Sequence, residues 1–144
     1  MNQPNKALKS IGQPCISLQV LVSNMLRHSQ PLAVRRNTII ENEVDNGFVL
    51  GGAMQKAIPV MRELLTTVVS NSRNGDIHIS ADRRNDQLVV EIQERNNYNG
   101  YALAFSVGSL AAEAAFAGAQ IDINGPQQKV VTISFVFPYV LQSA

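Results

Sequence analysis

The sequence predicts one α/β (α+β) domain, a two-layer sandwich in which helices pack on one face of a mixed, mostly antiparallel sheet. Three observations lead to this prediction. The first is that three segments repeat apolar residues with the helical period of about 3.6 residues. The second is that two other segments alternate apolar with polar residues, as strands do when one face of their sheet is exposed to solvent. The third is the predicted order of elements, which is strand, helix, strand, helix, two strands, helix, two strands. A chain of 144 residues is long enough to bury one core.

The first predicted helix follows a short strand at Pro14 to Ser17. It runs from about Leu18 to Ser29, with Ser17 as a natural N-cap, and we expect it to end before Pro31. Its apolar residues fall at positions i, i+3, i+4, i+7 and i+8, namely Leu18, Leu21, Val22, Met25 and Leu26. A single apolar stripe of this kind predicts packing on a sheet.

A strand at Asn37 to Val44 and a short apolar crossing at Phe48 to Gly52 lead to the second helix. This helix should run to about Ser72 with Pro59 in its first turn, because a proline inside a helix costs ~3 kcal/mol. Its predicted core stripe is Met61, Leu64, Leu65 and Val68.

The second half of the chain predicts four strands and one helix. The first of these strands has the apolar residues Ile77, Ile79 and Ala81 on one face, and the second has Leu88, Val90 and Ile92. After a polar turn at 96–100, a helix is predicted from Tyr101 to Ala117, ended by Gly118 as its C′ residue. The last two strands are predicted at Gln120 to Asn124 and Lys129 to Phe137.

The helix at 101–117 is apolar nearly all round. Its sheet-facing line is Leu103, Val107 and Leu110. Aromatic rings lie on a different side, at Tyr101, Phe105 and Phe116. A helix of this kind is buried on more than one side. We expect a second helix of the same domain to cover the rings; the alternative is an interface with a copy of the chain or with another partner.

Composition narrows the classes of function. The formal net charge of +1 argues against a nucleic acid or anionic membrane partner. No apolar run approaches the ~20 residues that span a bilayer, and the first residues lack the apolar stretch of a secretion signal. A single cysteine excludes an internal disulfide. We therefore predict a soluble, cytoplasmic protein with a flexible leader at 1–12, one domain at 13–138 and a C-terminal tail at 139–144.

Several short passages carry a resemblance to a known family. They are residues 13–18, 27–40, 61–77, 100–105 (Gly-Tyr-Ala-Leu-Ala-Phe), 118–121 (Gly-Ala-Gln-Ile) and the final strand to Phe137-Pro138. In this order and spacing they resemble the ATP-binding domain of sensor histidine kinases, which belongs to the Bergerat-fold (GHKL) ATPases. The resemblance covers nearly the whole chain and implies the fold predicted above.

The resemblance also implies where magnesium would bind. Residues 61–77 sit where the family has its asparagine box, N/E-L-L-x-N-A-x-K-x-T, and residues 63–67 align with it. Glu63 matches the acidic or polar residue at the start of the box. Thr67 replaces the asparagine that holds Mg²⁺ in the family, an ion that prefers oxygen ligands. Glu63 and Thr67 share one helix face at i, i+4. Asn71 lies one turn further on and is a poor substitute.

The nucleotide-binding glycine boxes of the family are altered here. Glu94 stands in the place of the aspartate that accepts a hydrogen bond from adenine, and Asn96 and Tyr98 replace the two glycines of the same box. Gly100 begins the second box, in which Ala102 replaces the middle glycine. Few residues separate Glu94 from Gly100, so the lid that covers the phosphates in the family is predicted to be deleted.

These losses act on one ligand. Each could cost ~1–3 kcal/mol, which together would weaken a micromolar site to millimolar or beyond. We predict a pseudoenzyme: a degenerate histidine kinase ATPase-like domain with no catalytic residue, no cofactor and no bound metal. It would act in two-component-type signalling by contact with a histidine kinase, a response regulator or itself, the last through 101–117.

Two alternatives stay open. A divergent but functional domain would bind Mg-ATP through Glu63, Thr67 and Glu94 and phosphorylate a partner. A third possibility is that the altered pocket, with Asn96 and Tyr98 at its rim, holds a different small ligand.

Other reactive residues have simpler explanations. His28 lies in the first predicted helix without the preceding helical hairpin of a phosphoacceptor, so we expect an exposed histidine, and the same for His78 on a strand's polar face. Cys15 is expected to behave as a small buried apolar residue. The pairs Arg35-Arg36 and Arg83-Arg84 are expected to be solvated, with docking of an acidic partner as the alternative.

Overall fold

The structure is a computed structural model that describes residues 15–138. The predicted leader at 1–12 and tail at 139–144 lie outside the described residues. The elements in chain order are β2 Ile16–Ser17, α1 Leu18–Arg35, β3 Ile39–Asn42, β4 Val49–Leu50, the 3₁₀ helix η2 Gly52–Ala57, α2 Ile58–Ser70, β5 Asp76–Arg84, β6 Gln87–Glu94, α3 Gly100–Gly108, α4 Ala111–Phe116, β7 Gln120–Asn124 and β8 Val131–Pro138.

The main sheet of the described residues has five strands in the order β3-β5-β6-β8-β7. Only β3 and β5 pair in parallel, and the other neighbours are antiparallel. Ile92 of β6 lies between Ile79 of β5 and Ile133 of β8, so the apolar faces of the central strands are in register. β2 and β4 form a separate antiparallel pair. The predicted mixed, mostly antiparallel sheet is confirmed.

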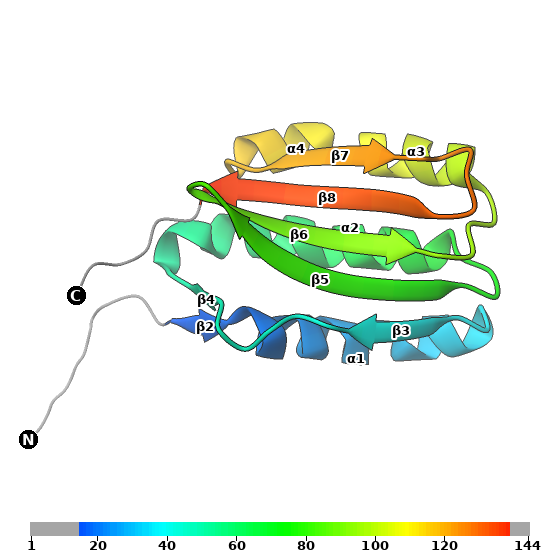
Figure 1. Cartoon of the computed structure of the whole chain (residues 1–144), viewed down its shortest axis with the longest axis horizontal. Helices are drawn as coiled ribbons and strands as arrows, with labels where there is room; N and C mark the ends of the chain where they lie inside the picture. The colour runs from blue at the N-terminus through cyan, green and yellow to red at the C-terminus, as the bar shows by residue number, and fades with distance from the viewer. Residues whose placement is uncertain (1–14, 139–144) are drawn as a thin grey trace, which may run out of the picture.

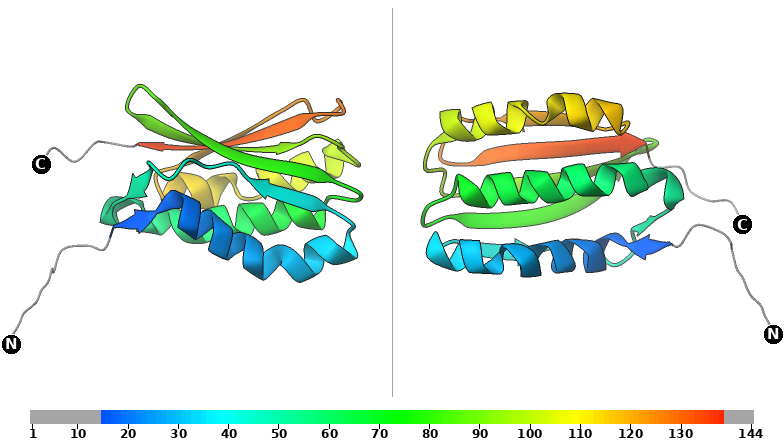
Figure 2. Two further views of the ribbon diagram at one scale, coloured as in Figure 1. Left: turned by 60° about the horizontal axis from the view of Figure 1, so that its bottom comes forward. Right: turned by 180° about the vertical axis from the view of Figure 1, so that it is seen from behind.

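All the long helices pack on one face of this sheet, and the other face is open (Figures 1 and 2). α1 and α2 lie side by side, and the α3–α4 segment runs along β7. The core between the two layers includes every residue of the predicted α2 stripe, with sheet residues such as Ile77, Ile79, Ile92 and Phe135. The two-layer sandwich is therefore also confirmed.

Helix α1 continues past Pro31 to Arg35, so the prediction that it ends before the proline is wrong. Pro31 has no N–H, so the carbonyl of Arg27 lacks its helical hydrogen-bond donor. Both residues are exposed, and water can donate to this carbonyl instead. Two residues after the proline, Ala33 is fully buried, and this packing favours the continued helix. The helix ends where Asn37 takes a positive φ of 52°. Predicted capping by Ser17 is confirmed, since its hydroxyl accepts from the Val20 N–H.

The helix predicted at 101–117 is two helices, α3 and α4, joined by Ser109 and Leu110. The Ser109 hydroxyl donates to the carbonyl of Ser106 at 2.6 Å, which competes with the helical pattern at this point. Leu110 bonds back only three residues, to Val107. Gly118 then ends α4 with a φ of +83°, as predicted.

No described helix covers the aromatic rings of this segment. Tyr101, Phe105 and Phe116 are 66%, 84% and 94% exposed. Leu103 and Val107 are buried against the rest of the domain, as predicted. The expectation that a second helix of the domain covers the rings is thus wrong for residues 15–138.

Candidate functional site

The helix α2 carries Glu63 and Thr67, and Asn71 caps its C-terminal end. They stand at i, i+4 and i+8, about 6 Å apart along the axis. Glu63 is exposed and makes no hydrogen bond or ion pair within residues 15–138. The Asn71 amide Nδ2 donates to the carbonyl of Thr67 at 2.9 Å. The Asn71 Nδ2 group therefore forms its hydrogen bond with the backbone at the end of α2.

Glu94, the last residue of β6, is 2% exposed and faces the protein interior. Its Oε1 accepts from the backbone N–H groups of Asp76 at 2.8 Å and Asn96 at 2.9 Å. Its Oε2 accepts from the Ser72 hydroxyl at 2.7 Å. The carboxylate thus joins the end of α2, the start of β5 and the end of β6, with a protein donor on each oxygen.

A glycine makes room for this carboxylate. A Cβ built on Gly75 would collide with Glu94 Oε2 and would lie 3.1 Å from the Cβ of Ser72. Neither Ser72 nor Gly75 was singled out from the sequence as a site residue. The signal was present, because the asparagine box ends in a threonine and Ser72 stands at that place.

The connection between β6 and α3 is five residues long, 95–99, and it is anchored at several points. The Asn96 amide donates to the carbonyl of Asn74 at 2.7 Å. The Asn97 amide donates to the carbonyls of Pro126 at 3.0 Å and Gln128 at 2.8 Å. Hydrogen bonds therefore join this connection to the α2–β5 turn on one side and to the β7–β8 connection on the other.

Gly100 and Ala102 begin α3, where Asn99 is the N-cap and accepts from the Ala102 N–H at 3.1 Å. Gly100 is buried, and a Cβ there would collide with the carbonyl of Pro126. The glycine is thus required by the neighbouring 125–130 connection of its own chain.

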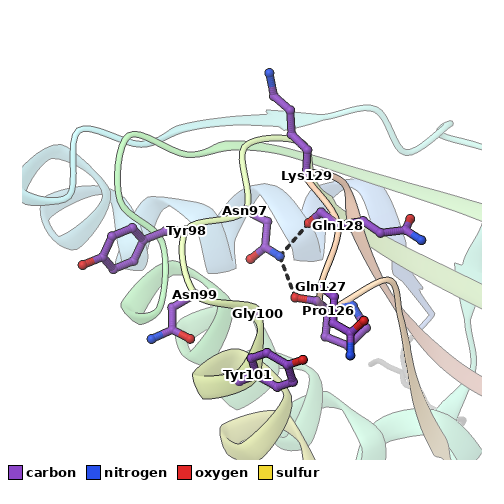
Figure 3. Close-up of a pocket in the computed structure, with 9 residues that line it drawn as sticks. All are labelled: Asn97, Tyr98, Asn99, Gly100, Tyr101, Pro126, Gln127, Gln128 and Lys129. Atoms are coloured by element: carbon purple, nitrogen blue, oxygen red, sulfur yellow. Dashed lines mark hydrogen bonds between the residues drawn. The ribbon is translucent and has the colours of Figure 1, made fainter.

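A polar cavity of about 530 Å³ opens beside these residues (Figure 3). Its lining residues are Asn97, Tyr98, Asn99, Gly100, Tyr101, Pro126, Gln127, Gln128 and Lys129. Of the predicted site residues only Gly100 lines this cavity; Tyr98 also lines it, and Asn96 does not. These lining residues include no carboxylate, histidine or cysteine, and the cavity offers hydrogen-bonding groups, two phenols and one ammonium group.

His78 lies between two carboxylates instead of being freely exposed, which corrects the prediction for this residue. Its Nδ1 is 2.6 Å from Glu43 Oε2, and its Nε2 is 2.9 Å from Asp76 Oδ1. The hydrogen bond to Glu43, with that to Asp76, raises the pKa of His78 above 6.5, although burial opposes the shift. Both acceptors are carboxylates, so both ring nitrogens donate only in the imidazolium form.

Cys15 and His28 are the other reactive residues named from the sequence. Cys15 is exposed, so the expectation of a buried apolar residue is wrong. His28 is exposed, as predicted. Among residues 15–138, no three His, Cys, Asp or Glu side chains gather as a metal site would require. None of the helices in this part of the chain has the length and apolar character needed to cross a membrane.

The chain has the fold of the ATP-binding domain of histidine kinases, and the resemblance noted in the sequence is confirmed at the level of fold. It is similar to the Acinetobacter baumannii histidine kinase AdeS (TM-score 0.67, 9% identity, covering 89% of this chain and 68% of that one). A Burkholderia phymatum STM815 histidine kinase has a TM-score of 0.67 and 14% identity, over 92% and 73% of the two chains.

The catalytic domain of histidine kinase ThkA, in a nucleotide-free form, is also similar, with a TM-score of 0.67 and 12% identity over 88% of this chain and 96% of that one. Neither a protein-family model nor a curated protein matches the chain. Identities this low show the fold alone.

Proposed function

We propose that this chain is a degenerate histidine kinase ATPase-like domain that does not use Mg-ATP and acts in two-component-type signalling through contacts with other proteins. The main support for this proposal is the set of hydrogen bonds that the Glu94 carboxylate accepts. By the resemblance, a carboxylate at this place accepts from the adenine amino group. Here it is buried, and three donors of its own chain already occupy it. Adenine would have to displace part of this network, at a cost in stability.

The residues present do not fit magnesium and a triphosphate. Mg²⁺ prefers near-octahedral oxygen ligands, which side-chain amides and carboxylates supply. Thr67 offers only a short hydroxyl, and Asn71 stands one helical turn further on, where its Nδ2 donates to the Thr67 carbonyl. The five residues 95–99 are too few and too firmly anchored to fold over phosphates as a lid. These features support an inert pocket.

Three partners are proposed: a histidine kinase, a response regulator, or a second copy of this chain. One similar structure is of histidine kinase ThkA in complex with the response regulator protein TrrA. The exposed rings of Tyr101, Phe105 and Phe116 support a contact with a copy through 101–117. Exposed aromatic side chains of this size are enriched at protein interfaces.

Thermal unfolding with excess Mg-ATP tests the proposal. A ligand present at 100 times its dissociation constant adds about 2.7 kcal/mol, and this raises the melting temperature of a chain of this size by several degrees. We expect no shift at millimolar nucleotide. The catalytic domain of an active histidine kinase, measured in parallel, is the positive control.

A divergent, functional kinase is the competing function, with Mg-ATP held through Glu63, Thr67 and Glu94. A clear shift that is lost in Thr67→Ala and does not occur without magnesium would establish this alternative and reject the inert pocket. Glu63→Ala should match the unaltered chain under our proposal, because Glu63 is exposed and makes no contact within residues 15–138.

A further inference from the structure

A second, basic cavity of about 230 Å³ lies next to the polar one. Its lining residues are Arg35, Arg36, Asn37, Arg73, Asn74 and Tyr98. They come from three connections: the end of α1, the α2–β5 turn and the β6–α3 connection. Tyr98 also lines the polar cavity, so the two hollows adjoin at this side chain.

The backbone that carries the arginines is well anchored. The Asn74 N–H donates to the carbonyl of Arg36 at 2.9 Å. The Asn37 amide donates to Asn74 Oδ1 at 2.8 Å. Both asparagines have a positive φ, 52° and 51°, so each turn is tight. The Arg73 guanidinium lies 5.4 Å from the Tyr98 ring centre, a cation–π distance.

The positive charge of the cavity is not neutralised by the described part of the chain. No carboxylate of residues 15–138 lies within ion-pair distance of Arg35, Arg36 or Arg73. A cation in the last turn of α1 interacts favourably with the helix dipole, which explains Arg35 in part. Arg73 lies just beyond α2, where its guanidinium contacts the Tyr98 ring and donates to the Tyr98 hydroxyl at 3.4 Å, but neither contact carries a negative charge.

The excess of cations extends over one end of the domain. The connections at this end are 36–38, 71–75, 95–99 and 125–130, and they lie together in Figure 1. These connections contain four cationic residues, Arg36, Arg73, Arg95 and Lys129, and no Asp or Glu. Arg35, the last residue of α1, adds a fifth cation at the same end. The flanking carboxylates are engaged, Glu94 in the core and Asp76 with His78. The whole chain has a net charge of only +1, so the charge is segregated.

We propose that this end docks an acidic segment of a partner protein, with a carboxylate side chain entering between the guanidinium groups of Arg35, Arg36 and Arg73. Guanidinium groups match carboxylates with paired hydrogen bonds. The inference deepens the proposed function by naming a contact surface and the chemistry of its partner. It rests on the role in protein contact, not on the state of the nucleotide pocket.

Magnitudes favour an acidic segment over a free anion. These arginines are exposed, and one exposed ion pair contributes only about 0–1 kcal/mol. A lone phosphate would therefore be held weakly, whereas a segment with several carboxylates meets several cations at once and is steered by the field of this end. A sequence pI of about 7.9 lies below the range typical of nucleic-acid-binding domains.

The test uses a short fluorescein-labelled oligoglutamate peptide and fluorescence anisotropy at low and high ionic strength. We expect saturable binding that weakens with salt, and about five- to tenfold weaker binding in Arg35→Gln/Arg73→Gln. The matched control is Arg27→Gln/Arg62→Gln, which removes the same charge from exposed positions on α1 and α2 outside this end. The control should bind like the unaltered chain. Arg35→Lys/Arg73→Lys should recover part of the affinity, since it keeps the charge but not the paired hydrogen bonds of a guanidinium group.

Several outcomes would overturn the proposal. They are no peptide binding at low ionic strength, equal weakening in both glutamine variants, or no recovery in the lysine variant. Displacement of the peptide by equimolar inorganic phosphate would indicate a small-anion site instead. Tighter binding of a single-stranded DNA oligonucleotide, lost in the same variant, would indicate a nucleic acid surface. Circular dichroism melting checks that all variants fold. The assay contains no nucleotide triphosphate, so its failure is separable from failure of the inert-pocket proposal.

Discussion

The hydroxyl of Ser72 and the carboxylate of Glu94 form a buried hydrogen bond of 2.7 Å that joins the end of α2 to the end of β6. Both side chains are nearly inaccessible to solvent, at 3% and 2% exposed. The Ser72 Oγ also lies 2.8 Å from the Val68 carbonyl oxygen, so its single hydroxyl proton is shared between these two acceptors. A group that could face a ligand is thus part of the structural core.

We expect Ser72→Ala to lower the free energy of unfolding by about 1–3 kcal/mol, because a buried carboxylate oxygen loses its donor. Urea unfolding followed by circular dichroism measures this. Ser70→Ala is the matched control, since Ser70 lies in the last turn of α2 and its side chain makes no hydrogen bond within residues 15–138. Equal losses in the two variants would contradict the role of the Ser72–Glu94 bond.

Gly100→Ala should be strongly destabilising, by about 1–3 kcal/mol or more, because the added Cβ would collide with the Pro126 carbonyl. Gly108→Ala, at the end of α3, places its Cβ in open space and should be neutral or stabilising. Melting temperatures of the two variants check the difference. A Gly100→Ala variant as stable as the unaltered chain would remove the packing explanation for this glycine.

His78 should make the stability depend on pH. Its pKa is raised in the folded chain by Glu43 and Asp76, so folding is favoured by the proton it binds. This contribution is fully present below the unfolded pKa of about 6.5 and is lost as pH rises through the higher folded value. Urea unfolding on both sides of this window measures it. His78→Gln should flatten this part of the pH profile; an unchanged profile would mean that the two hydrogen bonds contribute nothing.

Phe105→Ser should leave the stability almost unchanged, because the ring is 84% exposed. Leu103→Ala, two residues earlier and buried, should lose about 2–5 kcal/mol. Sedimentation velocity of the same variants examines the proposed contact with a second copy. A dimer that Phe105→Ser dissociates supports it, whereas a strict monomer at every concentration removes the copy from the proposed partners.

The fold could be predicted from the sequence because its main signals are local and periodic. The alternation of Ile77 and Ile79 with polar neighbours specifies which face of β5 is buried. Ser17, Pro59 and Gly118 mark helix ends through backbone chemistry that needs no distant partner. The site residues were also placed on the correct elements, with Thr67 on α2 and Glu94 at the end of β6.

Tertiary structure decided what these local signals could not. Packing of the buried Ala33 carries α1 past Pro31 against the local preference of proline. The three donors of Glu94 come from positions 72, 76 and 96, and their convergence depends on the antiparallel pairing of β5 and β6 and on the end of α2. The cluster of Arg35, Arg36 and Arg73 likewise forms only when the ends of α1 and α2 meet. Local chemistry sets the elements; contacts between distant residues set which side chains are used within the fold and which remain available.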